Sequence, residues 1–264
     1  MKKSHKAYAI LNLIVLLAII FWNYWVNAKG LNGNTVSSLS ADYENLFTPA
    51  GYAFSIWGLI FLALLAQAIF FIRRAFNDEK DSDFLSQLGP YLIMANIGNG
   101  LWIYMWLMEH TGISVVVMLG ILLSLVITIL NTNMERWDAP RAIIFWLWWP
   151  IALYSGWIAV ATIANISAYL AKIGWTGGIN EISWAITLIL IAVGLNLFMI
   201  ATRNLREFAS VGVWALIAIA VRHWGTIPSL QWTALTGAAV LFIAISIHGY
   251  QNRATAPFKL NQTN

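Results

Sequence analysis

Long apolar runs, separated by short polar stretches, are the dominant pattern of this chain. Most runs contain about the 20 residues that a helix needs to cross a hydrocarbon core of about 30 Å. The runs are continuous and lack the polar–apolar alternation of barrel strands, so they predict helices. The sequence therefore predicts an all-α integral membrane protein, a bundle of about eight transmembrane helices at residues 7–27, 49–72, 88–108, 112–131, 142–170, 180–202, 209–224 and 231–250.

Two of these runs leave alternatives open. The seventh is short and carries Arg222 near its end, so seven spans is an alternative count. The first follows three lysines and precedes Val26-Asn27-Ala28, a pattern that also suits a cleaved signal peptide. We interpret it as a retained helix, because the stretch from Trp22 to Trp25 suits an aromatic belt at the membrane boundary.

The positive charges predict the orientation of the spans. With the N-terminus in the cytoplasm, only Lys29, Lys172 and Arg222 of the 15 Lys and Arg residues fall on the outer side. This positive-inside bias predicts an even number of spans with both termini cytoplasmic. We expect the bacterial inner (plasma) membrane as the location. The formal net charge of +4 is explained by this topology, and no nucleic-acid partner is expected.

Composition narrows the classes of function. The chain is 60% hydrophobic and only 10% charged, which suits a lipid bilayer as its surroundings and not a soluble domain. It contains no cysteine and four scattered histidines, so neither thiol chemistry nor a metal site is expected. The sequence lacks the motifs of a hydrolase, a metalloprotease or a phosphate loop, and we expect no enzyme activity.

Aromatic and amide side chains recur at helical spacing in three runs. Phe54, Trp57 and Phe61 follow Pro49 at intervals that place all three on one helix face. The Gly/Asn/Ser-rich loop 28–48 leads into this motif, which favours a lid. Ordinary helix packing or lipid contact is the alternative explanation of the motif.

The third and fifth runs add polar atoms to this theme. Asn96, Asn99, Trp102 and Trp106 share one side of the third run, and two amides on that side predict contact with protein or a cavity. Hydrogen bonding between helices would explain the amides equally well. In the fifth run a continuous stripe joins Pro150, Tyr154, Trp157, Ala161 and Asn165, beside a Ser155-Gly156 pair that permits a close helix approach.

In their order along the chain, these motifs resemble the TspO/MBR family, the tryptophan-rich sensory proteins related to the mitochondrial translocator protein. The Asn-x-x-Trp pattern of that family's third helix matches Asn99 and Trp102. The Tyr-x-x-Trp-x-x-x-Ala-x-x-x-Asn pattern of its fifth helix matches Tyr154 to Asn165 with every spacing kept. In the family's Pro-Pro-x-Trp motif at the start of the second helix, this chain has Ala50 and Tyr52 in place of a proline and a tryptophan.

The resemblance implies a fold and a ligand. It implies a TspO-like five-helix core at residues 1–172, and residues 173–264 would add three C-terminal helices and a short tail. It implies binding of a flat hydrophobic ligand such as a tetrapyrrole, of porphyrin or haem type, in a sensory or transport role. No cofactor is required, and a homodimer is an expected assembly. The ligand-binding residues implied are Tyr52, Phe54, Trp57, Asn99, Trp102, Tyr154, Trp157, Ala161 and Asn165.

Two other functions are alternatives to ligand binding. A secondary transporter or permease for another small hydrophobic molecule is the alternative, although charges are almost confined to the ends of the runs. An intramembrane enzyme ranks third, because the chain shows no nucleophile–base pair or paired carboxylates.

Overall fold

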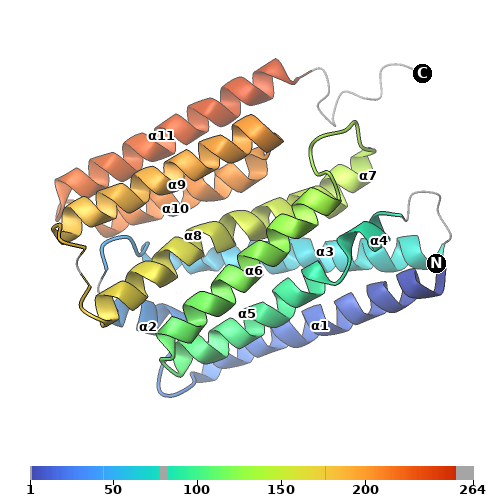
Figure 1. Ribbon diagram of the computed structural model, residues 1–264, viewed down its shortest axis with the longest axis horizontal. Helices are drawn as coiled ribbons and strands as arrows, with labels where there is room; N and C mark the ends of the chain where they lie inside the picture. The colour runs from blue at the N-terminus through green and yellow to red at the C-terminus, as the bar shows by residue number, and fades with distance from the viewer. Residues whose placement is uncertain (1, 44, 78–82, 176, 254–264) are drawn as a thin grey trace. The chain divides into compact units, whose positions relative to one another are not determined.

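A computed structural model describes residues 2–43, 45–77, 83–175 and 177–253 of the protein, so the C-terminal tail lies outside the described residues (Figure 1). The described chain is built of helices, and the predicted all-α membrane fold is confirmed. Six of its helical segments are long and apolar enough to cross a membrane. These are Ser4–Lys29, Gly51–Phe76, Thr111–Asn131, Arg141–Lys172, Glu181–Arg203 and Pro228–Gln251.

Each of the eight predicted runs lies on a helix, but two of these helices are short. Helices α5 (Tyr91–Leu107) and α10 (Arg206–Arg222) have 17 residues each. At a rise of 1.5 Å per residue such a helix is about 26 Å long, slightly less than a hydrocarbon core of about 30 Å. Six spans are therefore supported by length and composition, and the count of eight stays a prediction.

The helices form two compact units. The first, residues 1–43 and 55–134, contains α1 (Lys2–Lys29), α2 (Val36–Asp42), α3 (Ile56–Phe76), α4 (Phe84–Leu88), α5 and α6 (Thr111–Asn131). Helix α1 packs against both α3 and α5, and α5 also packs along α6 (Figure 1). Large apolar side chains of this unit are exposed, among them Leu62, Val116 and Leu123. This is expected where lipid is the solvent.

The second unit, residues 44–54 and 135–264, contains η1 (Gly51–Ser55, of which Ser55 belongs to the first unit), α7 (Arg141–Ile143), η2 (Ile144–Trp148), α8 (Trp149–Lys172), α9 (Glu181–Arg203), α10 and α11 (Pro228–Gln251). Helix α10 packs against α8, α9 and α11, and α9 also runs beside α11 (Figure 1). Because α8 groups with the C-terminal helices, the units divide the chain elsewhere than at residue 172. The domain boundary drawn from the resemblance stays a prediction.

The predicted helix at 49–72 begins later than expected. Residues Gly51–Ser55 form a 3₁₀ turn, and α3 starts at Ile56. The reason lies in the backbone partners of this stretch, because the Ala50 N–H donates to the Ala218 carbonyl at 3.1 Å. Pro49 is therefore not in the first turn of α3. Phe54 lies in the 3₁₀ turn, and Trp57 and Phe61 lie on α3, so the shared face of the three stays a prediction.

The predicted helix at 142–170 is interrupted near its start. Residues Ile144–Trp148 are π-helical, and the Trp149 N–H donates to the Ile144 carbonyl five residues back. Pro150 follows directly and has no N–H to donate, so the regular hydrogen-bond ladder cannot continue unchanged through this turn. The structure therefore has a widened turn directly before Pro150.

Candidate functional site

The polar side of α5 is buried, as predicted. Asn96, Asn99, Trp102 and Trp106 are each at most 7% exposed. The Asn99 Oδ1 accepts a hydrogen bond from Asn23 Nδ2 on α1 at 3.0 Å. The Asn99 Nδ2, also buried, has no acceptor among the residues that the structure describes. A buried donor without an acceptor is costly, so this amide is a candidate for binding a ligand oxygen or nitrogen.

Aromatic rings lie on the same side of α5. The indoles of Trp102 and Trp106 are stacked, with centroids 6.0 Å apart and planes 15° apart. Tyr43 meets Trp106 edge to face at 5.6 Å, and its hydroxyl donates to Glu109 Oε2 at 2.9 Å. The Trp106 Nε1–H is a second buried donor without an acceptor among the described residues. This side of α5 thus combines flat apolar walls with two unused donors.

Within residues 22–25, interpreted as an aromatic belt, Trp22 and Asn23 also contact α5. Asn23 is 7% exposed and bonds to Asn99, while the Trp22 Nε1–H donates to the Gly100 carbonyl at 3.2 Å. Both side chains therefore attach α1 to α5. Tyr24 is 75% exposed, as a boundary residue should be. The sequence signal for the contact of Asn23 was its amide within an apolar run.

The predicted stripe of the fifth run lies on α8. Tyr154, Trp157 and Asn165 are buried and Ala161 is partly buried. The ring of Phe54 meets the Trp157 indole edge to face, with centroids 5.9 Å apart and planes 84° apart. The structure therefore brings together one residue of the second predicted motif and one of the fifth-run stripe.

Tyr52 lies in the segment before α3 and contacts α10, not α8. Its ring meets Trp214 edge to face at 5.4 Å, and the Trp214 Nε1–H donates to the Ala53 carbonyl at 3.1 Å. Four residues before Tyr52, the Thr48 carbonyl accepts a hydrogen bond from Arg222 Nη1 at 2.9 Å. Arg222 is thus a partner of the backbone, a role that the sequence did not suggest. The spacing of Trp214, Ala218 and Arg222, four residues apart, was the available signal.

The predicted residues divide between the two units. Trp57, Asn99 and Trp102 belong to the first unit, where Trp57 stacks on Phe61 with centroids 5.1 Å apart. The second unit holds the others, Tyr52, Phe54, Tyr154, Trp157, Ala161 and Asn165. The two groups are accordingly described separately.

A polar cluster in the second unit was missed by the sequence reasoning. The Asn204 amide donates to the Glu135 carbonyl at 2.9 Å, and its Oδ1 accepts from His248 Nε2 at 3.0 Å. Burial, followed by the nearby Glu207 carboxylate, raises the pKa of Glu135 to about 7, while Arg206 opposes the shift. The Glu135 carboxyl therefore changes its charge near neutral pH. Asn204 adopts the left-handed backbone conformation that ends α9. Asparagine tolerates this conformation, so an asparagine after a long apolar run was the local signal in the sequence.

No group of His, Cys, Asp and Glu side chains suited to a metal ion occurs among the described residues. A protein-family model described as TSPO-like protein matches residues 9–247. The chain belongs to this TSPO-like family. No curated protein and no solved structure matched the chain.

Membership of the TSPO-like family fits the multi-pass membrane fold. The matched region covers α1 to most of α11 and is not confined to the first five predicted spans. The TSPO-like match therefore includes α9, α10 and most of α11, the three helices predicted as additions to a five-helix core. The contacts of α10 with residues 48–53 show that these helices also support the motif that precedes α3.

Proposed function

We propose that this TSPO-like protein binds a flat hydrophobic ligand with acidic edge groups, such as a tetrapyrrole, in a sensory or transport role. The observation that carries this proposal is the Asn99 Nδ2–H, a buried donor without an acceptor among the described residues. A carboxylate or ring nitrogen of such a ligand would accept from it. A hydrogen bond to a charged acceptor contributes about 1.5–3 kcal/mol.

The aromatic residues support the same ligand class. The stacked Trp102–Trp106 pair and the edge-to-face Phe54–Trp157 pair supply ring surface within the two units. Flat apolar molecules gain both burial and favourable ring geometry against such side chains. A porphyrin-type group is suited to these residues by its planar ring and its carboxylates, and it would act as a ligand and not as a required cofactor.

The test is quenching of tryptophan fluorescence by protoporphyrin IX in the detergent-purified protein. We expect saturable quenching, and Asn99→Ala should weaken binding about tenfold because it removes the buried donor. Trp102→Ala should also weaken binding, because it removes ring surface on the same side of α5 as Asn99. Both variants should insert into the membrane as the parent does.

Two controls separate recognition from folding. Asn23→Ala breaks the Asn23–Asn99 hydrogen bond but leaves the Asn99 donor in place, so it should bind protoporphyrin nearly as well as the parent. Asn131→Ala changes an exposed amide at the end of α6 and should have no effect. Equal binding by Asn99→Ala, Trp102→Ala and the parent would contradict the site on α5. Absence of saturable quenching would favour a permease for another small hydrophobic molecule.

A further inference from the structure

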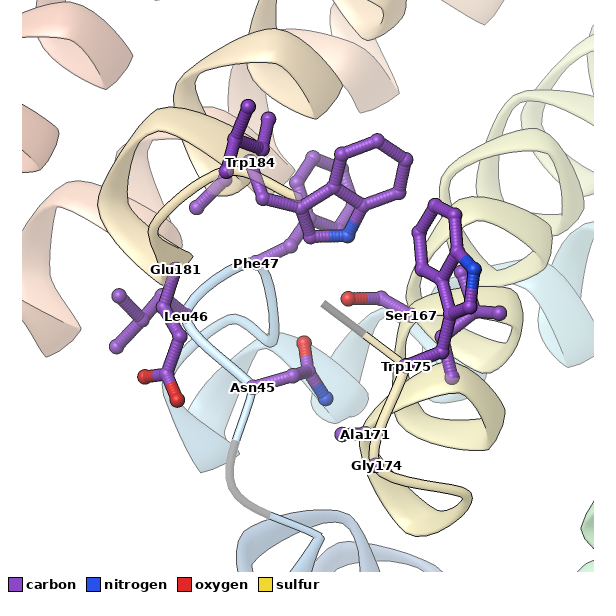
Figure 2. A pocket seen from close by; sticks show the side chains of 12 residues that line it. Asn45, Leu46, Phe47, Ser167, Ala171, Gly174, Trp175, Glu181 and Trp184 are labelled. Carbon is purple, nitrogen blue, oxygen red and sulfur yellow. The ribbon is translucent and has the colours of Figure 1, made fainter. Parts of the chain in front are cut away.

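A pocket of about 170 Å³ lies in the second unit, where residues 45–47 meet the end of α8 and the start of α9 (Figure 2). Its lining includes Asn45, Phe47, Ser167, Trp175, Glu181 and Trp184. Ligand pockets for larger molecules usually enclose about 300–1,000 Å³. This pocket is too small for a macrocycle and uses none of the nine residues predicted for one. It therefore points to a separate and much smaller ligand.

Aromatic rings form much of the pocket wall. The indoles of Trp175 and Trp184 lie edge to face, with centroids 5.2 Å apart and planes 73° apart. Phe47, 1% exposed, lies beside Trp184 (Figure 2). Both indoles line the pocket, and the face of an indole carries partial negative charge. A cation placed over such a face is attracted by the ring quadrupole.

The charged and polar groups of the pocket favour the same sign. Among the described residues of the lining, Glu181 is the one charged residue, and there is no lysine or arginine. The Glu181 carboxylate lies beside Leu46 on the side away from the two indoles, while the Ser167 hydroxyl and the Asn45 amide lie between Leu46 and Trp175 (Figure 2). The end of α8 borders the pocket through Leu170 and Ala171, whose carbonyls accept from the backbone N–H groups of Trp175 and Gly174, and the start of α9 borders it through Glu181.

We propose that this pocket binds a small organic ammonium ion. Indole faces and a carboxylate both stabilise a cation, and the small volume restricts it to a few heavy atoms. An ammonium group could come from a free amine or from the headgroup of a lipid. Trp175 is 47% exposed, so the pocket is accessible from outside the bundle.

The test uses fluorine NMR of protein labelled with 5-fluorotryptophan in a maltoside detergent, which carries no ammonium group. Tetramethylammonium chloride is titrated against equal concentrations of sodium chloride. The resonances that disappear in Trp175→Leu and Trp184→Leu identify the two indoles. We expect these two resonances to shift saturably with tetramethylammonium. The uncharged isostere tert-butanol should leave them in place at the same concentrations.

Matched variants assign the effect to the pocket. Glu181→Gln, at an exposed position that tolerates substitution, should raise the dissociation constant about tenfold, and Trp175→Leu should raise it similarly. Asp138→Asn and Trp232→Leu, which change an exposed carboxylate and an exposed indole outside the pocket lining, should leave it unchanged. Shifts that are absent, or equal with tert-butanol, or unaffected by both Glu181→Gln and Trp175→Leu would overturn the proposal.

Lipid nanodiscs distinguish the two sources. If a lipid headgroup is the ligand, phosphatidylcholine nanodiscs should give the shifted resonances without additive, and phosphatidylglycerol nanodiscs should not. If a free amine is the ligand, the resonances should be unshifted in both and should respond to tetramethylammonium in both. Either result supports an ammonium site. Protoporphyrin does not enter this test, so its outcome is independent of the tetrapyrrole proposal.

Discussion

Gly156 on α8 shows how a single missing side chain permits the packing of the second unit. A Cβ at this position would lie 2.7 Å from the Phe208 carbonyl oxygen and 3.1 Å from the Phe208 Cα of α10. These are backbone atoms, which cannot turn aside as a flexible side chain would. The pairing of Ser155 and Gly156 predicted a close helix approach, and at Gly156 this is confirmed. The sequence did not identify α10 as the partner.

Gly156→Ala should therefore destabilise the protein by about 1–3 kcal/mol, the usual cost of overpacking a well-packed contact. The measurement is the free energy of unfolding in detergent. Gly194→Ala on α9 is the matched control, since a Cβ there would meet nothing within 4 Å. Alanine is the better helix former, so this control should be neutral or slightly stabilising. A loss for Gly194→Ala as large as for Gly156→Ala would contradict the explanation.

At the scale of elements, residues 46–53 are attached along one side of α10 and the turn that follows it. The backbone of this segment forms hydrogen bonds with the side chains of Trp214 and Arg222 and with the carbonyl of Ala218. His223 Nε2 also donates to the Leu46 carbonyl at 2.8 Å. This attachment explains why α3 starts at Ile56 and not near Pro49. Helical spacing in the sequence could not show it, because the partners are about 160–177 residues away.

The attachment of this segment should depend on pH through His223, which follows the last residue of α10. Burial lowers the pKa of His223, the hydrogen bond to Leu46 raises it in part, and Arg222 lowers it. The attached state thus favours the neutral ring. Attachment should be complete above the ordinary histidine pKa of about 6.5 and should weaken as the pH falls below that value, where the released ring takes up a proton.

Hydrogen exchange of residues 46–53, corrected for the intrinsic pH dependence of exchange, measures this. Protection should fall between about pH 7 and pH 5 in the parent. It should become insensitive to pH in His223→Gln, whose amide can donate to Leu46 without titrating. His110→Gln, at an exposed histidine, is the control and should behave as the parent does. Loss of the pH dependence in His110→Gln, or its persistence in His223→Gln, would assign it to another group.

At the scale of the whole molecule, the prediction to test is the topology. Six helical segments satisfy both length and composition for crossing a membrane, and α5 and α10 are slightly short. A short helix can still span where the bilayer thins around it, at a modest cost. The excess of Lys and Arg on one side favours eight spans over seven.

Reporter fusions decide between eight spans and seven. A reporter after Asn264 should lie in the cytoplasm, and one inserted after Gly178, between α8 and α9, should lie outside. With a cytoplasmic N-terminus, the first result follows from an even total number of spans, and the second follows from five spans before Gly178. An external reading at the C-terminus would remove the eight-span prediction and favour seven spans.

The sequence by itself determined the class of fold, the positions of the membrane helices and the family motifs. Apolar run length and helical spacing are local properties, and they predicted α8 with its Tyr154-to-Asn165 stripe and the buried side of α5. The tertiary structure decided the partners. Asn23 bonds to Asn99, Tyr52 meets Trp214, and Trp175 meets Trp184 at a pocket with Glu181. Hydrogen bonds and ring contacts between distant residues depend on how helices pack, which no local spacing encodes.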